Sequence, residues 1–137
     1  MKINLVGILN ILSVLLFINA GLMVLCIPFA VYYDDGTLTN WIYSVAVSAV
    51  LGLGLWFSTA KSENRRKIKK RDGYIIVTLS WIVMALSGSV PFILTDSIPN
   101  FTNAFFESIS GFTTTGATIL DDIESLPESI LFWRSLT

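Results

Sequence analysis

Histidine is absent from this sequence, cysteine occurs once, and charged side chains make up only 14% of the residues. Because Cys26 is the sole cysteine and lies inside an apolar stretch, these residues can form neither an intramolecular disulfide nor a Cys/His metal site. No nucleophile is accompanied by a base at a spacing that supports covalent catalysis. The composition therefore argues against an enzyme.

Apolar side chains are abundant instead, at 53% of the residues, and the mean hydropathy is +0.70. Residues 3–33, 36–60 and 73–95 contain no charged side chain. Each of these runs exceeds the roughly 20 residues that a helix needs to cross the hydrocarbon core of a bilayer. We therefore predict an all-α integral membrane protein, whose first helix tilts or bends near Pro28, where one backbone hydrogen bond is lost.

The few charges are segregated by sign. Seven of the nine basic side chains lie between residues 61 and 71, whereas most acidic side chains occupy the other connecting segments. By the positive-inside rule, the basic loop at residues 61–72 is cytoplasmic, which places the N-terminus in the cytoplasm and the turn after residue 33 outside. We expect this loop to signal topology and to contact anionic membrane lipid, and we expect no nucleic-acid partner.

A half-length helix is predicted after the third apolar run. Asn100 or Thr102 can cap it, and apolar side chains then recur every three to four residues, at Phe101, Phe105, Ile109 and Phe112. At about 1.5 Å per residue, a helix over residues 100–112 reaches only about halfway across the hydrocarbon core. We therefore expect it to be re-entrant, with both ends on the same side of the membrane.

Residues 113–118 follow this helix and are rich in threonine. The three consecutive threonines at 113–115 are β-branched and resist helix continuation, while Gly116 permits backbone angles that other residues avoid. Non-helical backbone at membrane depth is tolerated only where it is buried in protein or lines a water-filled cavity. Its carbonyl and hydroxyl oxygens can replace the hydration shell of a monovalent cation. The segment predicts a cation pore or vestibule, although a surface turn would also explain these six residues taken alone.

The segment FFESISGFTTTGAT at residues 105–118, together with LFWRSLT at residues 131–137, resembles the first pore repeat of the Trk/Ktr family of potassium transport subunits. Members of this family fold as four consecutive helix, pore-loop, helix repeats around one pore, and Trk-type members add two leading helices. The resemblance implies two leading transmembrane helices in residues 1–60, the basic loop at 61–72 and the first pore repeat at 73–137. Within that repeat it implies an outer helix at 73–95, a pore helix at about 100–112, a filter at 113–118, an outer loop at 119–129 and the start of an inner helix at 130–137.

The resemblance also implies roles for individual residues. One quarter of a selectivity filter would be formed by the backbone carbonyls of Thr114, Thr115, Gly116 and Ala117. Thr113 and Thr118 would lie at its edges, and Glu107 would make hydrogen bonds behind the filter rather than touch ions. The expected activity is uptake of potassium (K⁺), or of potassium and sodium (Na⁺), across the cell inner membrane, without an organic cofactor.

A complete family member continues with the rest of the inner helix and with three further repeats. We therefore interpret the 137 residues as the N-terminal portion of a longer transporter. The family implies three partners: the remaining repeats, a second copy in a homodimer, and a cytoplasmic nucleotide-binding regulatory subunit. One alternative stays open, a small multi-span regulatory or assembly protein whose active features are the basic loop and the small-residue stripe of Ser44, Ser48 and Gly52.

Overall fold

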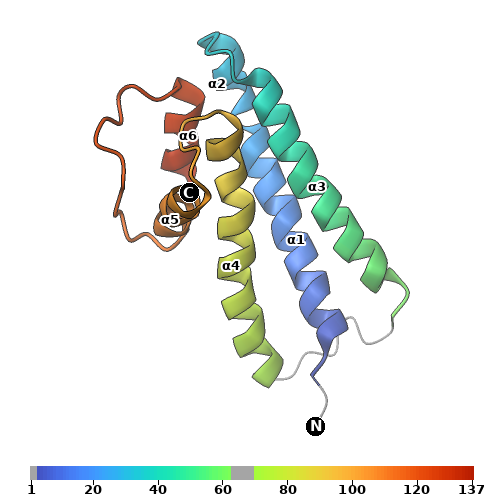
Figure 1. The fold of residues 1–137 in the computed structure, drawn as a ribbon. Helices are drawn as coiled ribbons and strands as arrows, with labels where there is room; N and C mark the ends of the chain where they lie inside the picture. Colours follow the sequence, from blue (N-terminus) through green and yellow to red (C-terminus); the bar gives the residue numbers. More distant parts are fainter. Residues whose placement is uncertain (1–2, 63–69) are drawn as a thin grey trace.

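The computed structural model describes residues 3–62 and 70–137. In Figure 1 the long helices run side by side, and short helices lie beside the end of α4 that is far from the N-terminus. The described residues contain no strand, and their helices are α1 (Leu5–Val24), α2 (Ile27–Tyr32), α3 (Leu38–Ala60), α4 (Lys70–Leu94), α5 (Phe101–Phe112) and α6 (Glu128–Leu136). The predicted all-α class is confirmed.

Within residues 3–62 and 70–137, three helical stretches are long and apolar enough to cross a membrane: Leu5–Tyr32, Leu38–Ala60 and Lys70–Leu94. The first of them is interrupted, because α1 ends at Val24 and α2 begins at Ile27. Pro28 has no N–H to donate, and in a continuous helix its ring would clash with the carbonyl of Val24. The predicted bend near Pro28 is therefore present, a few residues before the proline itself.

Some helix boundaries differ from the expected ones. α4 begins at Lys70 rather than at residue 73, and Asp72 in its first turn is a favourable charge near a helix N-terminus. Of the expected basic loop, residues 63–69 lie outside the described residues. α6 begins at Glu128 rather than at residue 130, directly after Pro127, so the loop before it spans residues 119–127.

Small and polar side chains fill the contact among α1, α3 and α4. Ser48 of α3 is fully buried, and Gly52 packs so closely that a Cβ there would lie 3.1 Å from the ring of Phe17. Asn19 of α1 donates from Nδ2 to Ser87 Oγ of α4 at 2.8 Å, and Ser48 Oγ lies 2.7 Å from the same oxygen. The small-residue stripe of α3 therefore packs against protein, as is typical of close helix contacts in membranes.

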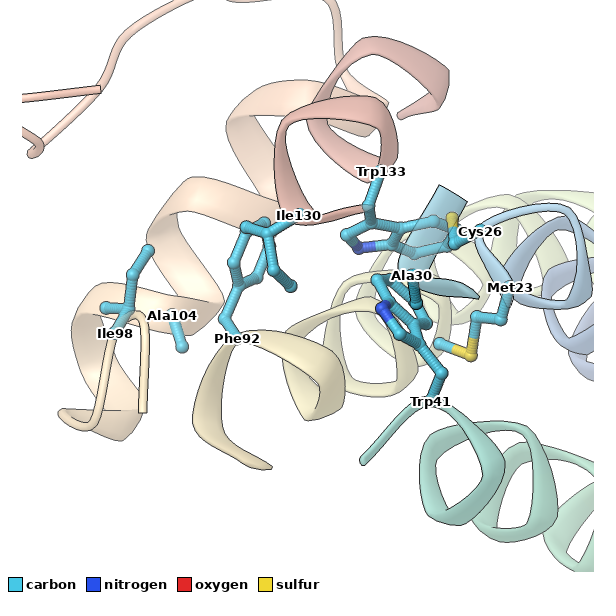
Figure 2. Close-up of a cluster of buried hydrophobic side chains, with 9 residues drawn as sticks. All are labelled: Met23, Cys26, Ala30, Trp41, Phe92, Ile98, Ala104, Ile130 and Trp133. Atoms are coloured by element: carbon cyan, nitrogen blue, oxygen red, sulfur yellow. The ribbon is translucent and has the colours of Figure 1, made fainter. Parts of the chain in front are cut away.

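A cluster of buried side chains joins α6 to the other helices, as Figure 2 shows for Met23, Cys26, Ala30, Trp41, Phe92, Ile98, Ala104, Ile130 and Trp133. The ring of Trp133 meets that of Trp41 edge-on, with 5.9 Å between centroids. Its Nε1 donates to the backbone oxygen of Gly88 at 3.1 Å. Because a buried indole N–H needs an acceptor, this bond orients the ring and anchors α6 to α3 and α4.

The short helix α5 packs tightly against α4 at Gly88. A Cβ at this position would lie 2.5 Å from Ser108 Oγ and 2.6 Å from Cε2 of Phe112. Real Cβ contacts are not that short, so only glycine fits here without a shift of α5. The missing side chain of Gly88 thus sets the distance between the two helices.

Gly88→Ala is expected to lower the free energy of unfolding by about 1–3 kcal/mol relative to Gly54→Ala, because overpacking forces Ser108 and Phe112 to move. Gly54 is a matched control, since it also lies in a membrane-spanning helix and a Cβ there meets no atom within 4 Å. Both substitutions gain the same helix propensity. The measurement is thermal unfolding of the full-length protein in detergent, and equal midpoints would contradict the close contact.

Candidate functional site

The helix α5 is held at its start by Asn100, whose extended backbone and side-chain oxygen cap the first turn; Oδ1 accepts from the amide of Asn103 at 3.3 Å. Its 12 residues correspond to about 18 Å. The buried residues of α5 are small or polar, namely Ala104, Glu107, Ser108 and Ser110, whereas Phe101 and Phe106 are exposed. Exposed phenylalanine side chains cost little free energy in lipid, because the lipid tails are apolar. The small and polar side chains of α5 then face the interior of the protein.

A Schellman motif built from threonines ends α5. Thr114 has a positive φ of 55°, its amide donates to Gly111 O at 2.8 Å, and the amide of Thr115 donates to Ser110 O at 2.9 Å. Glycine is the usual residue at this left-handed position. The three threonines are predicted to resist helix continuation, and α5 does end at Phe112. Thr113 and Thr114 form its cap, which satisfies two carbonyls that the end of the helix would leave unpaired. The segment beyond the cap begins at Thr115.

The segment that follows exposes its backbone. Gly116 has a φ of 71° and open space where a Cβ would lie. Ser110 Oγ of α5 donates to the carbonyl of Ala117 at 2.6 Å, which ties the segment back to the helix. Among the described residues, no hydrogen bond reaches the carbonyl oxygens of Thr114, Thr115 or Gly116. These three consecutive oxygens are available to a ligand from outside the chain.

The carboxylate of Glu107 lies at the centre of the site, with a side chain that is only 4% exposed. It accepts from Thr118 Oγ1 at 3.0 Å and from the amide of Ile119 at 3.3 Å. Arg134 of α6 donates to its Oε1 from Nε at 2.9 Å and from Nη2 at 2.6 Å. Glu107 therefore joins α5, the end of the exposed segment and α6, and the arginine balances its charge.

A second polar cluster connects the turn between α2 and α3 to the start of α6. Pro127 precedes α6 and offers no side-chain cap, but Asp35 Oδ2 accepts from the amide of Ser129 at 3.2 Å and from its Oγ at 2.6 Å. Trp41 Nε1 donates to the same Oγ at 2.9 Å, and Thr37 donates to Asp35. Burial by itself raises the pKa of Asp35, but the hydrogen bonds from Ser129 and Thr37 together outweigh it and lower the pKa below its ordinary value.

Comparison with known proteins identifies the family of the chain. The model of a cation transport protein family, TrkH, matches residues 38–137. The chain belongs to the TrkH family of cation transport proteins. The family predicted from the resemblance at residues 105–118 is thereby confirmed.

Relatives of the chain in the TrkH family come from bacteria and archaea. The Trk system potassium uptake protein TrkH of Escherichia coli K12 is 39% identical over 132 residues, which cover 95% of this chain and 27% of that protein. A cation transporter of Methanocaldococcus jannaschii is 31% identical over 135 residues, covering 98% and 27%. The crystal structure of the potassium transporter TrkH from Vibrio parahaemolyticus superposes with a TM-score of 0.85 at 36% identity, covering 98% of this chain and 28% of that one. The chain thus spans just over a quarter of the length of these relatives.

The residues predicted for the site include Glu107 and Thr118, but the prediction does not include Arg134 as the partner of Glu107. The structure brings Glu107 and Thr118 together and leaves residues 113–119 exposed. Arg134 was missed as a functional residue, although it is the sole basic residue in 72–137 and follows four apolar residues. A charge inside an apolar helix requires a partner, and this rule was the available signal.

Arg134→Met is expected to lower the free energy of unfolding by about 3 kcal/mol, because it leaves the Glu107 carboxylate buried without its cation. We take the low end of the range for buried pairs because the Arg134 side chain is 20% exposed. Lys61→Met, which removes an exposed cation, serves as the control. Thermal unfolding of the full-length protein in detergent compares the two, and equal effects would contradict the central role of the ion pair.

Because of Asp35, the free energy of unfolding is expected to depend on pH in the acid range. Because its folded-state pKa is lowered, its contribution is fully present above the ordinary value of about 4 and is lost as the pH falls through the lower folded-state pKa. The difference in thermal midpoint between wild type and Asp35→Asn is therefore expected at neutral pH and shrinks below about pH 4. A difference that stays constant down to acid pH would show that the charge of Asp35 contributes nothing.

Proposed function

We propose that this chain takes part in potassium uptake across the cell inner membrane and supplies one quarter of a selectivity filter. The observation that carries the proposal is the exposed run of unpaired backbone oxygens at Thr114, Thr115 and Gly116, directly after a half-length helix. Such oxygens can replace the water shell of a monovalent cation. The relatives named as potassium uptake proteins support K⁺ as the cargo.

In this proposal the filter consists of Thr114, Thr115, Gly116 and Ala117. The carbonyl of Ala117 already accepts from Ser110, but a carbonyl oxygen has two lone pairs and can also face a cation. The hydroxyls at the two edges act as supports: Thr113 Oγ1 donates to Ile109 O at 2.6 Å, and Thr118 donates to Glu107. Both edges are thereby tied to the pore helix rather than left free.

Glu107 acts in this proposal as the support behind the filter. Its oxygens are occupied by Thr118, Ile119 and Arg134, so it holds the outer end of the segment and does not coordinate the ion. Helix α5 then serves as the pore helix. The partial negative charge at its C-terminus is next to the filter segment and favours a cation.

We further propose that the N-terminus is cytoplasmic. In this proposal α1 and α2 together form the first leading helix, α3 forms the second, and residues from 73 onward form the first pore repeat. Lys61 and Lys70 lie at the ends of α3 and α4 nearest the N-terminus, which is consistent with the positive-inside rule (Figure 1). A working pore then requires the remaining repeats. A homodimer and a cytoplasmic nucleotide-binding subunit complete the assembly, and Na⁺ is the competing cargo to test.

Gly116→Asn in the full-length protein is expected to reduce K⁺ uptake by about tenfold or more, which corresponds to roughly 1.4 kcal/mol of lost coordination. The added side chain would occupy the open space beside the filter oxygens. The matched control is Gly36→Asn, because Gly36 has a nearly identical φ of 72° and also has open space at its Cβ position. Asparagine tolerates this backbone region, so both variants can keep their backbone conformation.

The measurement is rescue of potassium-limited growth in cells that lack their own uptake systems, at equal amounts of membrane protein. Loss of rescue with Gly116→Asn alone supports the filter. Equal rescue by both variants would remove the segment from the mechanism and favour the alternative of a regulatory or assembly protein. Repeating the rescue with Na⁺ in excess tests whether Na⁺ competes.

A further inference from the structure

We infer that the turn between α2 and α3 positions the filter by capping α6 from outside the pore repeat, with Asp35 and Ser129 as the positioning residues. This inference rests on the proposed function of the filter segment. We call the group formed by Asp35, Thr37, Trp41 and Ser129 the outer clamp. Its members come from two segments about 90 residues apart in the sequence.

The first step is that α6 has no cap of its own. Pro127 at the cap position offers no side-chain acceptor, and its backbone oxygen accepts from the amides of Ile130 and Leu131, so the amide of Ser129 needs an acceptor from elsewhere. Asp35 supplies a carboxylate to the amide and hydroxyl of Ser129, across 94 residues of sequence. A negative charge at a helix N-terminus is also favoured by the helix dipole. Ser129 is fully buried, so water does not replace the carboxylate.

The second step is that the clamp is attached to a firm support. The ring of Phe29 on α2 stacks on that of Phe132 on α6 with centroids 3.8 Å apart, next to the contact between Trp41 and Trp133. Deeper in the bundle, Asn19 of α1 is bonded to Ser87 of α4. The α1 to α3 part is therefore fixed to α4 independently of the clamp, and it can act as a reference for the position of α6.

The third step is that α6 connects the clamp to the filter segment. Arg134 lies five residues after Ser129, which is about 7.5 Å along the helix axis. Its guanidinium group holds Glu107, which in turn holds Thr118 at the edge of the filter. The ring of Trp133, with a centroid 6.3 Å from that of Phe112, also contacts the last residue of the pore helix. A shift at the start of α6 is therefore transmitted to both sides of the filter segment.

The consequence concerns ion discrimination. A carbonyl filter distinguishes K⁺ from the smaller Na⁺ through the arrangement of its oxygens. Loss of the clamp should therefore weaken K⁺ binding and its preference over Na⁺, whereas a residue that only stabilises the fold would reduce the amount of working protein. This difference separates a positioning role from a structural one.

The experiment compares Asp35→Ala, Ser129→Ala and the double variant with Asp34→Asn in the full-length protein. Asp34 is an exposed acid in the same turn with a positive φ of 49°, which asparagine tolerates. K⁺ uptake is measured against K⁺ concentration, with and without Na⁺, and normalised to membrane protein. Asp35→Ala is expected to raise the half-saturating K⁺ concentration by about tenfold, as for a lost helix cap, and to increase inhibition by Na⁺. Ser129→Ala should shift both in the same direction but by less, because it keeps the amide that donates to Asp35 and loses only the hydroxyl bonds. Asp34→Asn should match wild type.

The double variant and one further variant, Asp35→Asn, distinguish a positioning role from a structural one. The double variant should be milder than the sum of the two single effects, because either substitution removes the bond between Asp35 and Ser129 Oγ. Asp35→Asn should recover most of the K⁺ affinity, since asparagine caps helices almost as well as aspartate. A lower maximal rate with unchanged half-saturation and unchanged Na⁺ inhibition would overturn the inference, as would independent effects in the double variant. Gly116→Asn tests the filter separately from the clamp. If Gly116→Asn loses K⁺ uptake while Asp35→Ala keeps the K⁺ affinity of wild type, the inference about the clamp is rejected and the proposed filter is not.

Discussion

A buried carboxylate, that of Glu107, determines how the segments of the candidate filter meet. It belongs to α5 but accepts hydrogen bonds from Thr118 and Ile119 at the end of the exposed segment and from Arg134 on α6. An ionised carboxylate that leaves water is costly unless a cation and hydrogen-bond donors meet it. Burying this group therefore requires both the segment and α6 to converge on α5.

Close packing between helices is the second constraint. Lipid tails are as apolar as leucine side chains, so helices in a membrane associate mainly through tight contacts and interhelical hydrogen bonds. Gly88 permits α5 to approach α4, and Gly52 permits α3 to approach α1. The hydrogen bond from Trp133 to the backbone of Gly88 adds α6 to the same point. The absence of a side chain at Gly88 thus sets the distance between α5 and α4.

The end of α5 carries backbone strain that its neighbours maintain. A left-handed conformation costs an L-residue about 1–2 kcal/mol, and the cost is larger for a β-branched residue such as Thr114. Two cap hydrogen bonds hold it from the helix side, and the bond from Ser110 to Ala117 holds the segment beyond it. Strain that persists under such bonding is common where backbone atoms serve a ligand. It fits the proposal that these carbonyls face a cation.

The sequence by itself determined the features that depend on local rules: three membrane-spanning runs, a tilt or bend near Pro28, a half-length helix capped by Asn100 or Thr102, and the non-helical segment after it. Each follows from chain length against bilayer thickness or from the backbone limits of one residue type. Tertiary structure alone decided the pairings of Glu107 with Arg134 and of Asp35 with Ser129, which lie 27 and 94 residues apart. No local pattern encodes such partners, because a buried charge requires a counter-charge without specifying where in the chain it lies.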